Sequence, residues 1–187
     1  MRRLIDDIRA TIKGGDVGPE KIAQIESRVK EALPRLQASR VCTQTLSPGR
    51  YLCYKDPEYG FVIMVLVWAS GDGTPIHDHG IWGVEAVLRH SLKVTNYSQN
   101  ETDPQPLDTL IVAAGAIMHN LPPARDVHKV EHNSGDLAVS LHIYGREMTN
   151  NRSFVPGEGF KACRLECREL KLDLGLPAVT RHQDAGL

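Results

Sequence analysis

Residues 61–79 read FVIMVLVWASGDGTPIHDH and join an apolar segment, a turn and a pair of histidines. The first eight residues are almost entirely apolar and rich in β-branched side chains, which is typical of a strand buried on both faces. The glycines and Pro75 predict a turn after that strand. His77 and His79 then stand two positions apart, so on a strand both imidazoles point to the same face. This stretch therefore predicts a buried strand that leads into a chelating histidine pair.

Further strand-like segments follow, separated by Gly, Pro, Asn and Asp. They cover residues 81–88, 92–97, 109–112, 127–130 and 137–144. Many short strands of this kind are typical of a sandwich or a barrel. We therefore expect residues 50–175 to form a β-barrel core.

The first 45 residues have a helical pattern instead. One apolar face is marked by Leu4, Ile5, Ile8 and Ile12, and a second by Ile22, Ile25, Val29 and Leu33. Gly14 and Gly15 separate the two helices, Pro19 suits the first position of the second, and Pro34 is expected to follow its end. We expect residues 1–45 to form a helical extension packed outside the barrel.

Length and charge point to a single domain that acts on a small molecule. The 187 residues suit one domain over 1–187, and 22 Lys and Arg against 23 Asp and Glu leave a formal charge of −1. This balance favours neither nucleic acid nor an anionic membrane surface. No apolar run approaches the roughly 20 residues of a membrane span, and the start turns acidic before a signal-peptide core forms, so we expect a cytoplasmic protein. Its four cysteines are expected to be reduced thiols, and its oligomeric state is left open.

A third imidazole from a neighbouring strand would complete a three-histidine metal site with open positions opposite. His128 is the candidate for it, and His119 and His132 are alternatives. The alternating segment 140–144 places the side chains of Ser140, His142 and Tyr144 on one face, where the serine and the histidine can orient the phenol. Coordination chemistry alone leaves zinc and iron equally open.

Four pieces of the chain occur in an order and spacing that resemble the cysteine dioxygenase family of thiol dioxygenases, within the cupin superfamily. They are Trp68 before the glycine-rich turn, Ile76-His77-Asp78-His79, His128-Lys129-Val130-Glu131 and Ser140-Leu141-His142-Ile143-Tyr144. The Ile81-Trp82-Gly83 stretch is similar to the bacterial branch, which includes 3-mercaptopropionate dioxygenase-like proteins. The resemblance implies an all-β cupin fold, a double-stranded β-helix barrel or jelly roll, with the helices outside.

The resemblance also implies a function. One iron(II) ion would be held by His77, His79 and His128, and the enzyme would use O2 to oxidise a small carboxylated thiol, such as cysteine or 3-mercaptopropionate, to its sulfinate. Tyr144, supported by His142 and Ser140, would be the catalytic group. Animal members of the family carry a cysteine that crosslinks to the matching tyrosine, whereas this chain has Gly83 at that position.

The substrate handle departs from the family pattern. Cys53 stands where related enzymes carry an arginine or a glutamine, and a thiol cannot form a bidentate pair with a carboxylate. Arg152 is the chosen replacement, with Arg50 and Arg146 in competition. Glu85 has the strand parity of the histidine pair, so it is expected to point inward toward the metal, a substrate ammonium or an arginine.

Two other functions remain open from the sequence. A cupin that holds zinc or manganese would act as a hydrolase or an isomerase without O2. A non-enzymatic cupin would bind a small molecule and take up no oxygen with any thiol.

Overall fold

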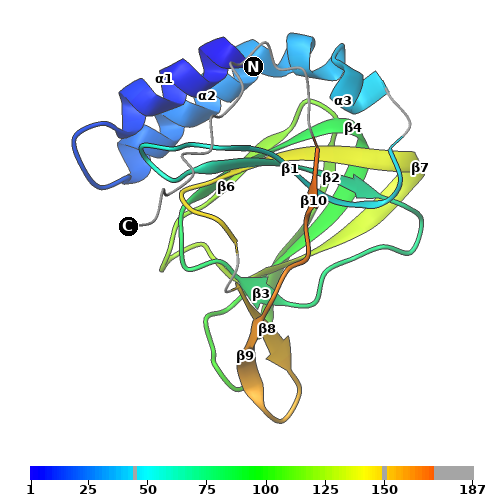
Figure 1. Ribbon diagram of the computed structural model, residues 1–187. Helices are drawn as coiled ribbons and strands as arrows, with labels where there is room; N and C mark the ends of the chain where they lie inside the picture. Colours follow the sequence, from blue (N-terminus) through cyan, green and yellow to red (C-terminus); the bar gives the residue numbers. More distant parts are fainter. Residues whose placement is uncertain (44–45, 149–150, 171–187) are drawn as a thin grey trace, which may run out of the picture.

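The computed structural model describes residues 1–43, 46–148 and 151–170, and the expected end of the barrel at residue 175 lies outside this part. The helices are α1 (Arg2–Ile12), α2 (Pro19–Gln37) and α3 (Arg40–Thr43). The strands are β1 (Gly49–Lys55), β2 (Val62–Trp68), β3 (His77–Asp78), β4 (Gly83–Tyr97), β5 (Pro106–Ala113), β6 (Ile117–Asn120), β7 (His128–Tyr144), β8 (Asn151–Val155), β9 (Gly159–Cys163) and β10 (Arg168–Glu169). They form one curled, ten-stranded sheet, which fits a cupin barrel (Figure 1). None of the described helices combines the length and the apolar composition needed to cross a membrane.

Strand β7 is the centre of the sheet. Its second half lies between β2 and the first half of β4, antiparallel to both. Its first half continues along β4, and its first residue, His128, pairs with His77 of β3. Strand β3 also pairs with β8, and these strands lie on the side of the sheet away from the helices (Figure 1). The curl of the sheet therefore brings segments far apart in sequence to one end of the barrel.

Strands β4 and β7 are each one long strand, where the sequence predicted two short ones. Residues 83–88 and 92–97 belong to the single strand β4, which stays paired with β7 through register shifts in its middle. At this bend His90 has a φ of 59°, and Gly135 of β7 has a φ of 88°. A Cβ at Gly135 would lie 2.2 Å from His90 Nδ1, so the glycine is required for the close approach. The polar residues between the predicted short strands do not form turns. They lie in a bend of the continuous β4–β7 pair.

Helices α1 and α2 form a layer over one face of the sheet (Figure 1). The apolar faces predicted for them are buried, as the sequence pattern required. They share one hydrophobic cluster with Val84, Ala86 and Leu88 of β4. Each fully buried aliphatic side chain in such a cluster contributes roughly 1.5 to 3 kcal/mol to stability. Gln37 adds a polar contact, since its Nε2 donates a hydrogen bond of 3.2 Å to the carbonyl of Leu88.

The prediction that α2 ends before Pro34 was wrong, because the helix continues to Gln37. Proline has no N–H to donate and its ring crowds the preceding turn, which is why the sequence predicted an end there. Leu33 and Leu36 are both buried on the sheet, and this packing holds the last turn in place.

Asp56, directly after β1, fastens α1 to the sheet. Its fully buried carboxylate accepts hydrogen bonds from Arg9 Nε at 2.6 Å and from the Tyr54 hydroxyl at 2.9 Å. The backbone N–H groups of Glu58 and Tyr59 donate to the same carboxylate at 2.9 and 2.8 Å. Burial alone would raise the pKa of Asp56, but these donors outweigh it and lower the pKa below the ordinary value.

We expect Asp56→Ala to lower the free energy of unfolding by about 2 to 3 kcal/mol at pH 7, because buried donors lose their acceptor. The pKa of Asp56 is lower in the folded than in the unfolded chain, so the ionised carboxylate stabilises the fold above the ordinary carboxyl pKa of about 4. The difference between wild type and variant should shrink as the pH falls below that value. Urea unfolding at several pH values measures it, and the exposed Glu58→Ala serves as the control.

Candidate metal centre

Three imidazoles converge at the end of the barrel near β3. His77 and His128 are register partners on β3 and β7, and His79 directly follows β3. The ring centroids lie 4.8 Å apart for His77 and His79, 4.7 Å for His77 and His128, and 4.9 Å for His79 and His128. One nitrogen of each ring lies within 4.8 Å of the others. The structure thus brings the three predicted ligands into a group that can hold one metal ion from one side.

Hydrogen bonds to the far side of two rings decide which nitrogen faces the centre. His77 Nδ1 donates to the carbonyl of Pro75 at 3.0 Å, and His79 Nδ1 donates to Asp126 Oδ1 at 3.2 Å. In the neutral form of each ring, Nε2 is then the unprotonated nitrogen. His79 Nε2 is buried, and no hydrogen-bond partner for it exists among the described residues. An orphaned lone pair that faces two other imidazoles is what a bound metal ion would satisfy, so these residues fit a metal site.

Two of these imidazoles, those of His77 and His128, are neutral in this environment. Burial, together with the neighbouring imidazoles, lowers the pKa of His77 well below its ordinary value and lowers the pKa of His128 to about 4. A histidine binds a metal through its neutral form, so at neutral pH no proton has to leave these two rings before binding.

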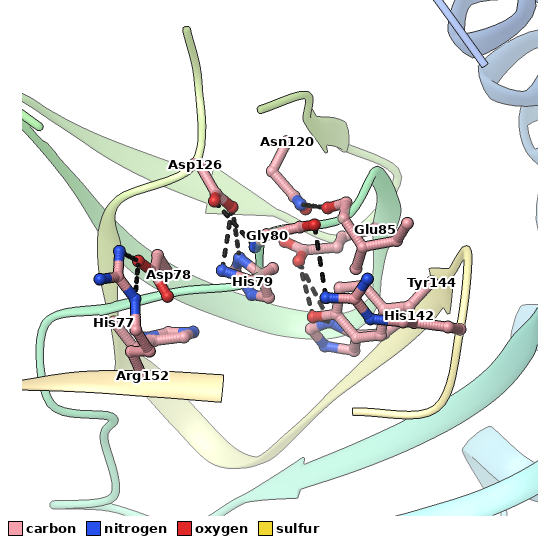
Figure 2. A network of polar contacts seen from close by, with 12 residues as sticks. His77, Asp78, His79, Gly80, Glu85, Asn120, Asp126, His142, Tyr144 and Arg152 are labelled. Carbon is pink, nitrogen blue, oxygen red and sulfur yellow. Dashed lines mark hydrogen bonds and ion pairs between the residues drawn. The ribbon is translucent and has the colours of Figure 1, made fainter. Parts of the chain in front are cut away.

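Asp126 organises the segment that carries His79. Besides the imidazole, it accepts the backbone N–H of His79 at 3.0 Å and that of Gly80 at 2.9 Å (Figure 2). Burial opposes the charge of Asp126, but the bonds from His79 and Gly80 prevail and lower its pKa. Sequence reasoning missed Asp126, and the only signal was an acid two positions before His128.

We expect Asp126→Ala to raise the dissociation constant for a divalent metal ion by about 10-fold to 100-fold, since the His79 ring loses its anchor. Titration with zinc(II) against a competing chelator gives this constant. The matched control is Asp136→Ala, an exposed aspartate on β7. Equal affinity in the Asp126 variant and in wild type would show that the carboxylate does not support the centre.

A cavity of ≈ 310 Å³ opens beside the three imidazoles. Its wall is mixed, with apolar side chains from β2 and from the segments that follow β7, and with the charged residues Arg50, Arg164 and Glu166. The cavity is lined by Met64, Leu66, Met148, Leu165, Arg50 and Arg164, besides the three histidines, His142 and Tyr144. The half-buried Arg50 has no carboxylate within ion-pair distance among the described residues. A cavity of this kind suits a small molecule with an anionic group and an apolar part.

The predicted trio of Ser140, His142 and Tyr144 forms one hydrogen-bonded chain. Ser140 Oγ lies 2.7 Å from His142 Nε2, and His142 Nδ1 lies 3.0 Å from the Tyr144 hydroxyl. Two groups that sequence reasoning did not place there extend the chain. Trp68 Nε1 donates to Ser140 Oγ at 2.9 Å, and the Tyr144 hydroxyl donates to Glu85 Oε1 at 2.9 Å. The Tyr144 ring also stacks on His79, with centroids 5.3 Å apart, which ties the chain to the imidazole group.

Two of the residues proposed for substrate binding, Cys53 and Arg152, do not line the cavity. Cys53 is not part of the cavity wall but belongs to the cluster between the helices and the sheet, where burial raises the pKa of its thiol to about 12. All four cysteines are free. Arg152 is also absent from the wall, because its guanidinium pairs with Asp78 (Figure 2). It pairs with Glu101 as well. Of the arginines that the sequence left in competition, Arg50 is the one that reaches the cavity.

Glu85 points inward as its strand parity required, and its partners among the described residues are Tyr144 and His142 (Figure 2). Burial alone would raise the pKa of Glu85, but its interaction with His142 prevails and holds the pKa below the ordinary value. Burial and the charge of Glu85 together raise the pKa of Tyr144 well above the usual range of a phenol. Tyr144 is therefore a phenol, not a phenolate, at neutral pH.

The two rival histidines lie outside the group. His119 on β6 bonds through Nδ1 to Glu26 of α2 at 2.8 Å. His132 on β7 bonds through Nε2 to the carbonyl of Asp136 at 2.7 Å. Neither belongs to the grouped ligand atoms, so His128 is the third member.

No protein-family model matches this chain. Solved structures similar to it include a cupin 2 conserved barrel domain protein from Rhodopseudomonas palustris, with 17% identity and a TM-score of 0.45 over 60% of this chain and 73% of that one. An RmlC-like cupin protein from Ralstonia eutropha has 15% identity and a TM-score of 0.44, over 62% and 63%. A hydroquinone 1,2-dioxygenase, solved with Cd²⁺ and 4-hydroxybenzonitrile, has 13% identity and a TM-score of 0.43, over 59% and 73%. Such TM-scores and identities are too low to assign a family or an activity.

Proposed function

We propose that this chain is a thiol dioxygenase that uses iron(II) and O2 to convert a small carboxylated thiol into its sulfinate. The observation that supports it most is the group of three imidazoles beside a cavity that contains an arginine. The grouped ligand atoms of the described residues include no carboxylate. The reaction balances as RS⁻ + O2 → RSO2⁻, so no further reductant is required.

The ligand set favours an anionic sulfur. Three neutral nitrogens leave the full double charge of a divalent ion in place, whereas a carboxylate ligand would reduce it. Bound iron(II) would supply a positive centre that lowers the pKa of a thiol and a redox-active site for O2. His77, His79 and His128 would hold it on one side only, which leaves neighbouring positions free toward the cavity.

Arg50 is suited to hold the carboxylate of the substrate. It lines the same cavity as the imidazoles, and its positive charge opposes the rise in the pKa of Tyr144, so the charge acts on that part of the site. An arginine offers a carboxylate two parallel hydrogen bonds, which fixes both the position and the orientation of the molecule. Met64 and Leu66 of β2, together with Met148, provide apolar contacts for the carbon chain between the carboxylate and the sulfur.

The test is oxygen consumption by the iron(II)-loaded protein against cysteine, 3-mercaptopropionate and mercaptosuccinate, with mass analysis of the products. We expect uptake of one O2 per thiol and a product with two added oxygen atoms for at least one substrate. The zinc-loaded protein is the control and should be inactive. No oxygen uptake with any thiol would contradict the proposal, and turnover that needs no oxygen would instead indicate a hydrolase or an isomerase.

A further inference from the structure

Glu85 is a buried carboxylate, only 4% exposed, and it is not part of the cavity wall. It stands on β4 opposite His142 of β7. Among the residues that the structure describes, no lysine or arginine lies within ion-pair distance of it; its ion-pair neighbour is His142, with Nδ1 at 3.4 Å from Oε1. The same oxygen accepts the Tyr144 hydroxyl at 2.9 Å. Burial of an ionised carboxylate costs free energy. A functional reason is therefore expected for a carboxylate that contacts the hydroxyl of a cavity-lining tyrosine.

The directions of the hydrogen bonds follow from the donors available. A carboxylate only accepts, so the single hydroxyl hydrogen of Tyr144 goes to Glu85. The contact of 3.0 Å between Tyr144 and His142 then needs the hydrogen on Nδ1 of the imidazole, which donates to the phenol oxygen. This holds whether the imidazole is neutral or protonated, because Nδ1 carries a hydrogen in both forms. Ser140 and Trp68 complete the chain on the far side of the imidazole.

The Tyr144 ring cannot turn away from this arrangement. One face stacks on His79, with ring planes 23° apart. Gly83 lies against the ring edge, where a Cβ would come within 2.7 Å of Cδ1 and 2.8 Å of Cε1. Absence of a side chain at position 83 therefore allows the ring to lie this close to β4, and the ring position fixes where the hydroxyl oxygen stands.

We propose that Glu85 is a positioning residue that holds the hydroxyl hydrogen of Tyr144 and so makes the phenol oxygen an acceptor rather than a donor. This inference concerns a residue of the site on which the proposed function rests. A substrate group that meets the phenol oxygen would then have to bring its own hydrogen, as an amino or ammonium group does. Without Glu85, the side-chain contact that remains for the phenol hydroxyl is Nδ1 of His142, so the phenol hydrogen turns to that nitrogen and the direction of the chain reverses.

Nitrogen-15 NMR of the histidines in the zinc-loaded protein tests the reversal, because zinc is diamagnetic and the readout needs no turnover. In wild type we expect a hydrogen on His142 Nδ1. Glu85→Leu should remove it, whereas Glu85→Gln should retain it, since the amide oxygen can accept the phenol hydrogen. Glu131→Gln, on the outer part of β7 beside Lys129, is the control and should leave the signal unchanged.

With iron(II) bound, Glu85→Leu should lower kcat by about 10-fold to 100-fold at unchanged iron content, and Glu85→Gln should restore most of the rate. A bare Nδ1 in wild type would overturn the inference even if Glu85→Leu failed to fold. A hydrogen retained on Nδ1 in a folded Glu85→Leu protein would overturn it as well. The NMR result does not depend on thiol oxidation. If no thiol led to oxygen uptake, the proposed function would be contradicted, but the role of Glu85 would still be decided by the NMR experiment.

Discussion

His128→Ala should weaken iron(II) binding by roughly 100-fold to 1000-fold and abolish thiol oxidation. Total binding energies of protein metal sites divide into about 3 to 4 kcal/mol for each ligand, which corresponds to this range. The effect should be large because the two remaining imidazoles, His77 and His79, come from one short segment and cannot enclose the ion alone. Anaerobic titration with a competing chelator measures the affinity, and oxygen consumption measures the activity.

The matched control is His132→Ala, which removes an imidazole from the same strand outside the group. It should keep both affinity and activity. Circular dichroism should show that both variants are folded. Normal iron binding by the His128 variant would mean that the three rings do not hold the ion together.

Arg50→Met should lower kcat/KM for a carboxylated thiol by about 100-fold, mainly through KM. A charge-assisted pair contributes about 1.5 to 3 kcal/mol, and the loss of an arginine that binds with two hydrogen bonds lies at the upper end of that range. The change keeps the apolar stem and removes only the charged head, so the cavity should retain its shape. Steady-state kinetics with 3-mercaptopropionate gives the value.

Two comparisons sharpen this result. 2-Aminoethanethiol has no carboxylate, so the ratio of its kcat/KM in wild type and in Arg50→Met should be close to one. Arg35→Met, an exposed position on α2, should leave all substrates unaffected. If Arg164→Met, on the same cavity wall, produced the loss and Arg50→Met did not, the carboxylate would have to be assigned to Arg164.

Local periodicity predicted those parts of the fold in which each element buries one face. The apolar faces of both helices and the buried strand at 61–68 follow from it directly. It could not predict where packing overrides a local signal. The bend at His90 depends on Gly135 of another strand, and the end of α2 depends on Leu36 meeting the sheet.

The candidate site shows the same limit. The histidine pair and the trio of Ser140, His142 and Tyr144 are local patterns, so the sequence predicted their shared faces. The part of the cavity wall that β1 contributes could not be predicted in this way. The sequence of β1 has no pattern that shows which of its faces points into the barrel. Arg50 pairs with Leu66 on the cavity side, whereas Cys53 shares the helix-covered face with Tyr51. The sequence of β1 alone therefore could not show that Arg50, rather than Cys53, lines the cavity.

The source of the oxygen atoms tests the central claim most directly. The iron(II)-loaded protein is supplied with a carboxylated thiol that it consumes, under oxygen-18 gas in ordinary water, and the product is analysed by mass spectrometry. A sulfinate that carries two heavy oxygen atoms is the expected result, because both atoms of O2 go to sulfur beside the three imidazoles. A product without heavy oxygen, or one with a single heavy atom and one from water, would contradict it.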